Sequence, residues 1–176
     1  RCKAINNKND FIFDLYNERI EDSLDVISIK FKKILILGDH GAKIYRYIQN
    51  RYKEAQVRIY DIKTQYSKLD LENVIKSTID LDFWDPEESR FDLIISNSYL
   101  NIYEDLNKIL SKIMKSLLPN GFFLATLPSP ENFSLLRSAM MKTDMQLYGG
   151  TYSRFNRTLE LQTIIDLLKK NNFKIP

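Results

Sequence analysis

A glycine, an acid or a small polar residue follows several short apolar runs in the sequence. In a parallel sheet the carboxyl ends of the strands share one edge, and ligands bind there. We therefore expect these residues to border one crevice. An acid after the second run, Asp61, suits a ribose because a carboxylate accepts hydrogen bonds from both hydroxyls; the alternative is that it only caps or solvates a turn. The residues are Gly38, Asp61, Asp80 and the adjacent Ser96 and Asn97.

The loop after the first apolar run, residues 38–43, reads Gly-Asp-His-Gly-Ala-Lys. A pyrophosphate cofactor needs glycines that let the backbone approach it and a helix N-terminus free of anions. Asp39 places an anion in this loop and His40 fills a glycine position, so NAD and FAD are disfavoured. The sequence also lacks a P-loop pattern. A cofactor with a cationic centre and no phosphate, such as S-adenosylmethionine, is compatible with Asp39.

The composition excludes several classes of site. The 176 residues include 26 Lys and Arg against 23 Asp and Glu, and this net charge of +3 is too small to predict nucleic-acid binding. A single Cys (Cys2) and a single His (His40) exclude an intrachain disulfide and a Cys- or His-rich metal centre, so we expect no metal. No apolar run reaches the roughly 18 residues of a membrane span and no secretory signal is recognisable, so we expect a cytoplasmic protein.

Hydrophobic periodicity predicts helices and strands in alternation. Apolar runs such as 34–37 are typical of buried parallel strands, whereas apolar residues three or four apart, as in 106–117, predict helices. This order predicts an α/β fold with a doubly wound, mostly parallel sheet. We expect helices at 10–27, 44–52, 69–76, 106–117, 131–142 and 161–168, and strands at 34–37, 57–60, 77–83, 91–95 and 122–127, with a further strand beginning at 173–175.

The residues that end the predicted strands, together with the segments 91–97 and 117–121, form a pattern that resembles the class I S-adenosylmethionine-dependent methyltransferases. The likeness is nearest to the branch that contains the biotin-pathway malonyl-carrier-protein methyltransferase and the methyltransferase-like assembly factor of mitochondrial complex I. Residues 98–106, 135–138 and 149–150 resemble further segments of that branch. The resemblance implies a Rossmann-like fold, S-adenosylmethionine as cofactor and methyl transfer to a small-molecule or protein-borne acceptor.

The resemblance also implies roles for single residues. The backbone around Gly38 would approach the methionine part of the cofactor, Asp61 would hold the ribose, and the residue after it would pack on adenine. Asp80 and Leu81 would face the adenine, and the pair that ends the fourth strand would line the floor under the sulfonium. The implied cofactor-binding residues are Gly38, Asp39, His40, Asp61, Ile62, Asp80, Leu81, Ser96 and Asn97.

The chain departs from the family pattern in the first loop. His40 and Ala42 stand where the family has glycines, and Ile36 stands at the position of an acid. A side chain where the backbone should touch the cofactor takes up space and demands positive φ from a residue other than glycine. Asn101 replaces a family histidine and removes a candidate base. An alternative is therefore an assembly or binding factor with weak or no cofactor binding, or a hydroxylase on the same fold.

The whole of 1–176 reads as one domain, with a core at 31–128 and a cap or lid at 129–157, and the last strands of the fold are expected beyond this stretch of chain. Residues 148–157 combine glycines, aromatics and arginines, so they suit an acidic or acyl substrate; the alternative is an exposed linker. No catalytic residue is assigned, because methyl transfer needs alignment more than a protein nucleophile. The substrate-contacting residues that we expect are Tyr99, Tyr152 and Arg154.

Overall fold

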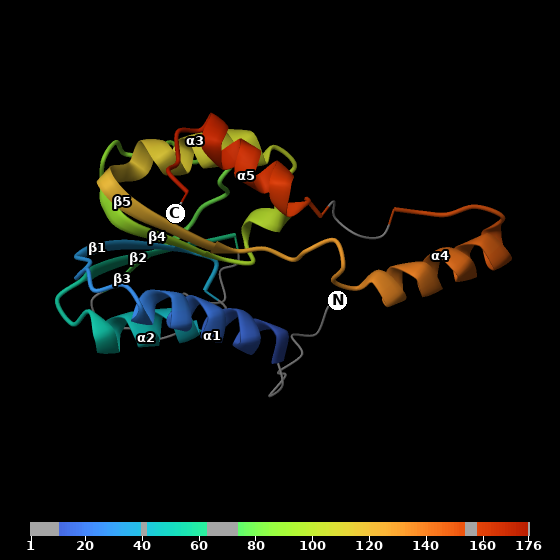
Figure 1. The fold of residues 1–176 in the computed structure, drawn as a ribbon, viewed down its shortest axis with the longest axis horizontal. Helices are drawn as coiled ribbons and strands as arrows, with labels where there is room; N and C mark the ends of the chain where they lie inside the picture. Colours follow the sequence, from blue (N-terminus) through green and yellow to red (C-terminus); the bar gives the residue numbers. More distant parts are fainter. Residues whose placement is uncertain (1–10, 40–41, 63–73, 154–157, 176) are drawn as a thin grey trace.

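A parallel sheet of five strands, in the order β3-β2-β1-β4-β5, forms the centre of the computed structural model, which describes residues 11–39, 42–62, 74–153 and 158–175 (Figure 1). This order places β1 between β2 and β4, so successive crossovers run in opposite directions from the middle of the sheet. The predicted fold class, a doubly wound parallel sheet, is confirmed. The strands are β1 Lys33–Leu37, β2 Gln56–Asp61, β3 Val74–Thr78, β4 Phe91–Asn97 and β5 Leu117–Thr126.

Helices cover both faces of the sheet. Figure 1 shows α1 and α2 on one face and α3 and α5 on the other, while α4 extends away from the sheet. A short 3-10 turn, η3, follows β4. The elements are α1 Phe11–Asp25, α2 Lys43–Arg51, η3 Leu100–Ile102, α3 Leu106–Ser116, α4 Ser134–Tyr148 and α5 Leu161–Lys170.

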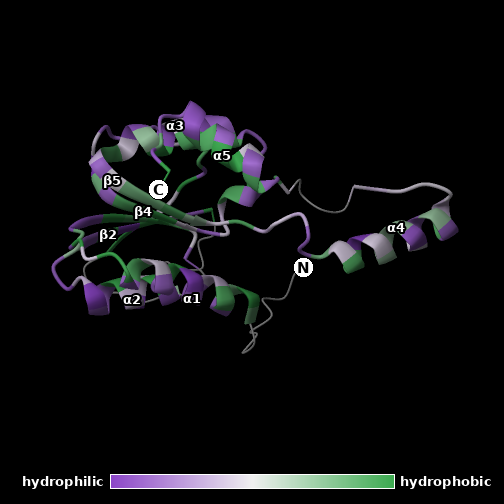
Figure 2. Ribbon diagram, in the orientation of Figure 1, coloured by the Kyte–Doolittle hydropathy of each residue, from purple (hydrophilic) through white to green (hydrophobic). Residues whose placement is uncertain are grey.

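Strand β1 lies in the middle of the sheet and is buried on both faces, which explains its unbroken apolar run. Ile34 and Ile36 pack into the core under α1 and α2, and Leu35 and Leu37 pack into the core under α3. All four side chains are fully buried, and burial of each stabilises the fold by about 1.5–3 kcal/mol. In Figure 2 the hydrophobic colour follows the inner strands, in agreement with this arrangement.

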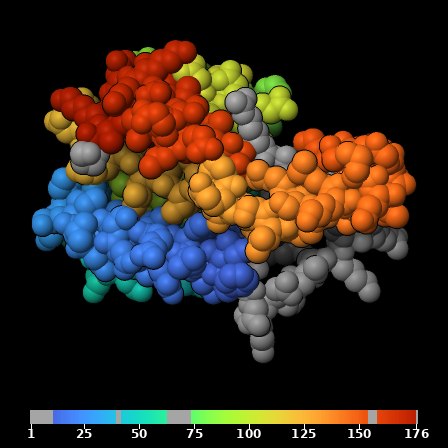
Figure 3. Space-filling view, turned by 45° about the vertical axis from the view of Figure 1, so that its right-hand side comes forward, coloured from blue at the N-terminus to red at the C-terminus, as the bar shows by residue number. Residues whose placement is uncertain are grey.

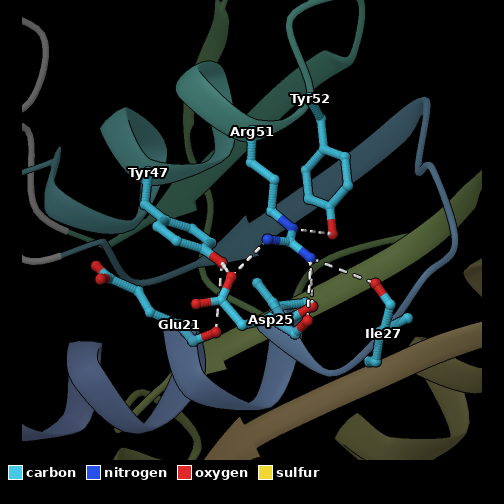
Figure 4. A network of polar contacts seen from close by, with 7 residues as sticks. Glu21, Asp25, Ile27, Tyr47, Arg51 and Tyr52 are labelled. Carbon is cyan, nitrogen blue, oxygen red and sulfur yellow. Dashed lines mark hydrogen bonds and ion pairs between the residues drawn. The ribbon is translucent and has the colours of Figure 1, made fainter.

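A polar cluster at the surface joins α1 to α2 (Figure 4). The Arg51 guanidinium forms an ion pair with Asp25 and donates to the carbonyl oxygen of Leu24 at 3.0 Å. The Tyr47 hydroxyl donates to the same Asp25 carboxylate, and Arg51 Nε donates to the Tyr52 hydroxyl at 3.1 Å. These bonds fix the end of α1 against the end of α2, so the two helices cover their face of the sheet as one unit.

The predicted elements around β3 are wrong. Part of the helix expected at 69–76 is strand, because β3 runs from Val74 to Thr78 and residues 69–73 lie outside the described part of the chain. The strand expected at 77–83 ends at Thr78, because the Asp80 carboxylate accepts a hydrogen bond from the Asp82 N–H at 3.0 Å and forms a turn. As the edge strand, β3 pairs only with β2 and needs no long apolar run.

The C-terminal segments differ from the prediction in two places. Residues 173–175 form no strand, and the Phe173 ring packs against Phe123 with its centroid 5.5 Å away. Strand β5 begins directly after α3, and its pairing with β4 skips from Leu117 opposite Phe91 to Phe122 opposite Leu93. The Pro-Asn-Gly sequence forms this irregularity, and Asn120 adopts a φ of 62° there.

Helix α4 projects from the body of the molecule, as Figure 1 and the turned view in Figure 3 show. Asp144 is its only buried residue, and several of its large apolar side chains, such as Leu135 and Met145, are exposed. Its weak segregation of polar and apolar residues agrees with a helix that packs on little else. Among the described residues, no helix combines the length and the apolar character that a membrane crossing needs.

Candidate functional site

The ends of β1, β2 and β4 lie side by side at the carboxyl edge of the sheet. Leu37 is in register with Tyr60 of β2 and with Ser96 of β4, so the next residues, Gly38, Asp61 and Asn97, form one row. The Gly38 N–H continues the ladder and donates to the Tyr60 carbonyl at 3.0 Å. The structure thus brings together the strand-end residues that the sequence singled out.

Asp61 ends β2 with its side chain mostly inside the molecule. Only 8% of the residue is exposed, whereas 43% of the next residue, Ile62, is exposed. The Ile79 N–H donates to the Asp61 carbonyl at 3.1 Å, which brings the chain after β3 alongside and places Asp80 near the same edge. A carboxylate followed by an exposed apolar side chain suits a ribose and its base, because the carboxylate accepts from the hydroxyls and the apolar side chain packs on the base.

Asp39 accepts hydrogen bonds from the first turn of helix α2. Its residue is fully buried, Oδ1 accepts from the Ile44 N–H at 3.1 Å, and Oδ2 accepts from the Tyr45 N–H at 2.9 Å. Burial raises the pKa of this carboxyl to about 6, although the backbone hydrogen bonds and Arg46 oppose the shift. The first-turn donors of α2 are therefore taken by the chain's own carboxylate, which accords with the expectation that no phosphate binds there.

The glycine-poor loop is only partly described. His40 and Gly41 lie outside the described residues, and so does the His40 contact expected from the sequence. Ala42 is described, and it adopts a φ of 58° and ψ of 30°, the left-handed conformation that glycine adopts most easily. The backbone at this position thus has the conformation expected of a family glycine, and alanine supplies it at a cost in strain.

Ser96 and Asn97 face opposite sides of the sheet, as successive residues of a strand must. The Asn97 amide donates to Asn17 Oδ1 of α1 at 2.6 Å and accepts from the Thr126 hydroxyl of β5 at 3.1 Å. The Ser96 hydroxyl is buried and has no hydrogen-bond partner among the described residues. Asn97 therefore ties the edge to α1, whereas the Ser96 hydroxyl and Asn17 Nδ2 are buried without a hydrogen-bond partner among the described residues.

Leu81 is a core residue. Its side chain is fully buried, its N–H donates to the Tyr103 hydroxyl at 3.1 Å, and its carbonyl accepts from Lys112 Nζ at 2.8 Å. Asp80 lies at the start of the same turn. The backbone of 80–82 is thus held against α3 and Tyr103, and this segment forms a fixed wall of the edge.

Of the three expected substrate residues, the structure places only Tyr99 at this edge. Tyr99 follows β4, and its ring lies so close to Gly38 that a Cβ on Gly38 would be 2.5 Å from Tyr99 Cδ2. Tyr152 lies beside α4, with its ring 5.8 Å from that of Tyr148, and Arg154 is outside the described residues. The sequence did not single out Tyr103 or Asn17, which hold Tyr99 and Asn97. Asn17 lies within helix α1 and Tyr103 lies in the link between η3 and α3, so neither stands at the end of an apolar run.

Comparisons with curated protein sequences find distant relatives. No model of a known protein family matches the chain. The mitochondrial arginine-hydroxylase NDUFAF5 of Dictyostelium discoideum is 24% identical, over 95% of this chain and 43% of its own length. The highly reducing polyketide synthase acrA of Aspergillus aculeatus is 28% identical, over 63% of this chain and 4% of its own length. The chain thus spans less than half of either curated relative.

Solved structures show the fold. An S-adenosylmethionine-dependent methyltransferase from Mesorhizobium loti superposes with a TM-score of 0.67 at 17% identity, covering 93% of this chain and 84% of that one. Phosphoethanolamine N-methyltransferase 2 of Haemonchus contortus, solved with S-adenosyl-L-methionine, gives 0.64 at 20% identity, covering 88% of this chain and 36% of that one. The chain has the fold of class I S-adenosylmethionine-dependent methyltransferases.

The residues at the edge fit such a cofactor in kind. Gly38 has a φ of 69° and lies in contact with the Tyr99 ring, Asp61 carries two carboxylate oxygens, and the Ser96 hydroxyl is buried without a partner among the described residues. An uncharged backbone cradle beside an acid suits a ribose attached to a positively charged sulfur better than it suits a phosphate.

Proposed function

We propose that this domain binds S-adenosylmethionine at the carboxyl edge of its sheet and transfers the methyl group to an acceptor. The observation that carries the proposal is the single row of Gly38, Asp61 and Asn97 on β1, β2 and β4. The row lies where the strand order reverses direction, which is where open α/β sheets bind ligands. The methyltransferases among the solved structures support this choice.

In this proposal each residue of the edge has a defined task. Asp61 accepts hydrogen bonds from the ribose hydroxyls, Ile62 covers one face of the adenine, and the Gly38 backbone lies along the amino-acid part. The Ser96 hydroxyl supplies a further hydrogen bond from the floor of the site. The bound cofactor supplies a methyl group on a cationic sulfur, and the acceptor displaces it directly. The protein then contributes alignment and exclusion of water.

The acceptor is a small molecule or a protein-borne group in this proposal, and the segment 129–157 covers it. Tyr152 is the described residue of that segment that we assign to acceptor binding. The second candidate function is an assembly or binding factor, or a hydroxylase, on the same fold. The likeness to the arginine-hydroxylase over 95% of the chain and the strained Ala42 favour this alternative.

Calorimetric titration with S-adenosylmethionine tests the proposal. Asp61→Ala should weaken binding by about 1.5–3 kcal/mol, the scale of a hydrogen bond to a charged group. Asp92→Ala is the matched control, because Asp92 is an acid of β4 whose carboxylate accepts from the Lys32 and Lys33 N–H groups away from the edge. Equal affinities of wild type and Asp61→Ala would show that Asp61 holds no ribose.

Incubation with candidate acceptors then separates the two functions. A methyltransferase adds the labelled methyl group of S-adenosylmethionine to its acceptor, and mass spectrometry distinguishes that product from one with an added oxygen. A folded protein that shows no binding at millimolar cofactor would favour the assembly or binding factor.

A further inference from the structure

Tyr99 fills the space beside Gly38 that the proposed cofactor needs. A Cβ built on Gly38 would lie 2.5 Å from Cδ2 and 2.8 Å from both Cβ and Cγ of Tyr99, so the ring is in direct contact with the glycine backbone. Only 7% of Tyr99 is exposed. The glycine that would let a ligand approach the end of β1 is covered by a side chain of the protein itself.

The Tyr99 hydroxyl extends from the end of β1 toward the end of β2. Burial raises the pKa of this hydroxyl, and the Tyr103 hydroxyl and the Asp61 charge raise it further, whereas the Ile62 N–H lowers it. Tyr99 is therefore close to both Asp61 and Ile62. Its side chain spans Gly38 to Asp61, the same interval that a ribose and its amino-acid tail would occupy.

Two features hold Tyr99 in this place. Ser98, just before it, has a φ of 49°, a left-handed conformation that is strained for serine, and its N–H donates to Thr126 Oγ1 at 3.0 Å. The Tyr103 hydroxyl donates to the Tyr99 hydroxyl at 3.4 Å and is itself held by the Leu81 N–H. The turn at Ser98 directs the ring inward, and Tyr103 secures its far end.

We infer that the Tyr99 ring competes with S-adenosylmethionine for the same space. The cofactor binds only when the turn at Ser98 carries the ring away from Gly38. This inference rests on the proposed function. The apparent affinity is then the intrinsic affinity multiplied by the fraction of molecules in which Tyr99 is outside the site. A minor state of this kind is typically populated at about 0.1–10%.

Direct titration with S-adenosylhomocysteine tests the inference. Tyr99→Ala should bind about tenfold or more tightly than wild type, because a tenth or less of the wild-type molecules are open. Tyr99→Phe keeps the ring over Gly38 and should stay within about threefold of wild type. Tyr52→Ala is the matched control: Tyr52 is also 7% exposed but packs on Phe31 under the opposite face, and its affinity should equal that of wild type.

The outcomes are distinct. Equal or weaker binding by folded Tyr99→Ala, with wild type binding, would overturn the role of Tyr99 and leave the proposed cofactor in place. Failure of wild type and both Tyr99 variants to bind at millimolar nucleoside, with the proteins folded, would overturn the proposed cofactor and this inference with it.

A second measurement needs no cofactor. Gly38→Ala forces a Cβ into the Tyr99 ring, so it should lower Tm more in wild type than in a Tyr99→Ala background, where only the strain of positive φ remains. Equal shifts in the two backgrounds would show that the ring does not lie on Gly38 in solution and would overturn the inference. If Tyr99→Ala does not fold, Tyr99→Leu serves in both experiments.

Discussion

The carboxyl edge of the sheet and helix α4 differ in what fixes their residues in space. Gly38, Asp61 and Asn97 are placed by the ladders of three neighbouring strands, and each is held by contacts with distant parts of the chain. Leu135 on α4 is 87% exposed, and the Tyr152 ring lies against Tyr148 at the end of the same helix. Ligand geometry at the edge therefore depends on the whole sheet, whereas α4 can change position without disturbing the sheet.

The same substitution in both regions gives the largest expected contrast. Leu37→Ala, at the buried end of β1, should lower the free energy of unfolding by about 2–5 kcal/mol, because a large side chain is lost from a closed core. Leu135→Ala on α4 should change it by less than about 0.5 kcal/mol. Urea denaturation of both variants makes the measurement. A cost at Leu135 comparable to that at Leu37 would show that α4 packs on the body in solution.

The pH dependence of the free energy of unfolding tests Asp39, a buried residue at the edge of the sheet. Since the pKa of Asp39 is raised from 3.8 to about 6 in the folded state, the folded protein binds this proton more tightly than the unfolded chain. The resulting stabilisation is complete below about pH 4 and is lost as the pH rises through 6, a change of up to about 3 kcal/mol.

Asp39→Asn has no such proton, so the difference in unfolding free energy between variant and wild type should vary with pH between 4 and 7. Chemical denaturation at several pH values measures this difference. Parallel profiles for the two proteins would contradict the raised pKa.

The smallest effect is expected on α4 itself. Tyr152→Ala removes the ring that contacts Tyr148 and should leave the unfolding free energy within about 0.5 kcal/mol of wild type. Amide exchange along α4 should be fast in the free protein, because the helix has few tertiary contacts, and slow once an acceptor is bound beneath it. Strong protection of α4 in the free protein would mean that it is a fixed element.

The strand ends could be predicted from the sequence because a buried parallel strand has an unbroken apolar run with a sharp end. The run before Gly38 and the run before Ser96 both have this form. Strand β1 ends at Leu37 as predicted, whereas β4 continues past the predicted end at residue 95 to Asn97. The edge strand β3 has no such run, so its position was wrong by several residues. Leu81 then fell inside the predicted strand 77–83, and the resemblance placed it beside the adenine, whereas the structure places it in the core.

The position of Tyr99 beside Gly38 could not be predicted from local sequence patterns. Tyr99 lies against Gly38 directly after Ser98, which adopts positive φ, a conformation that serine rarely adopts and that no spacing of apolar residues encodes. The role of Asp39 was also hidden, because an acid just before a helix serves equally well in a ligand site or as a cap. Tertiary contacts between distant segments decided both cases.

The hydrogen bond between Asn17 and Asn97 also bears on how the chain folds. Its two residues are 80 positions apart, and Thr126, which completes the group, lies further along still. Helix α1 leaves the ribosome long before β4 and β5 exist, so its final docking site is formed late in synthesis. Contacts of such sequence separation slow folding, and α1, although it can pack on α2 and β1 earlier, completes its docking only after β4 and β5 are made. The Asn17 side chain therefore finds its partner only in the last stage of folding, once the strand that carries Asn97 is in the sheet.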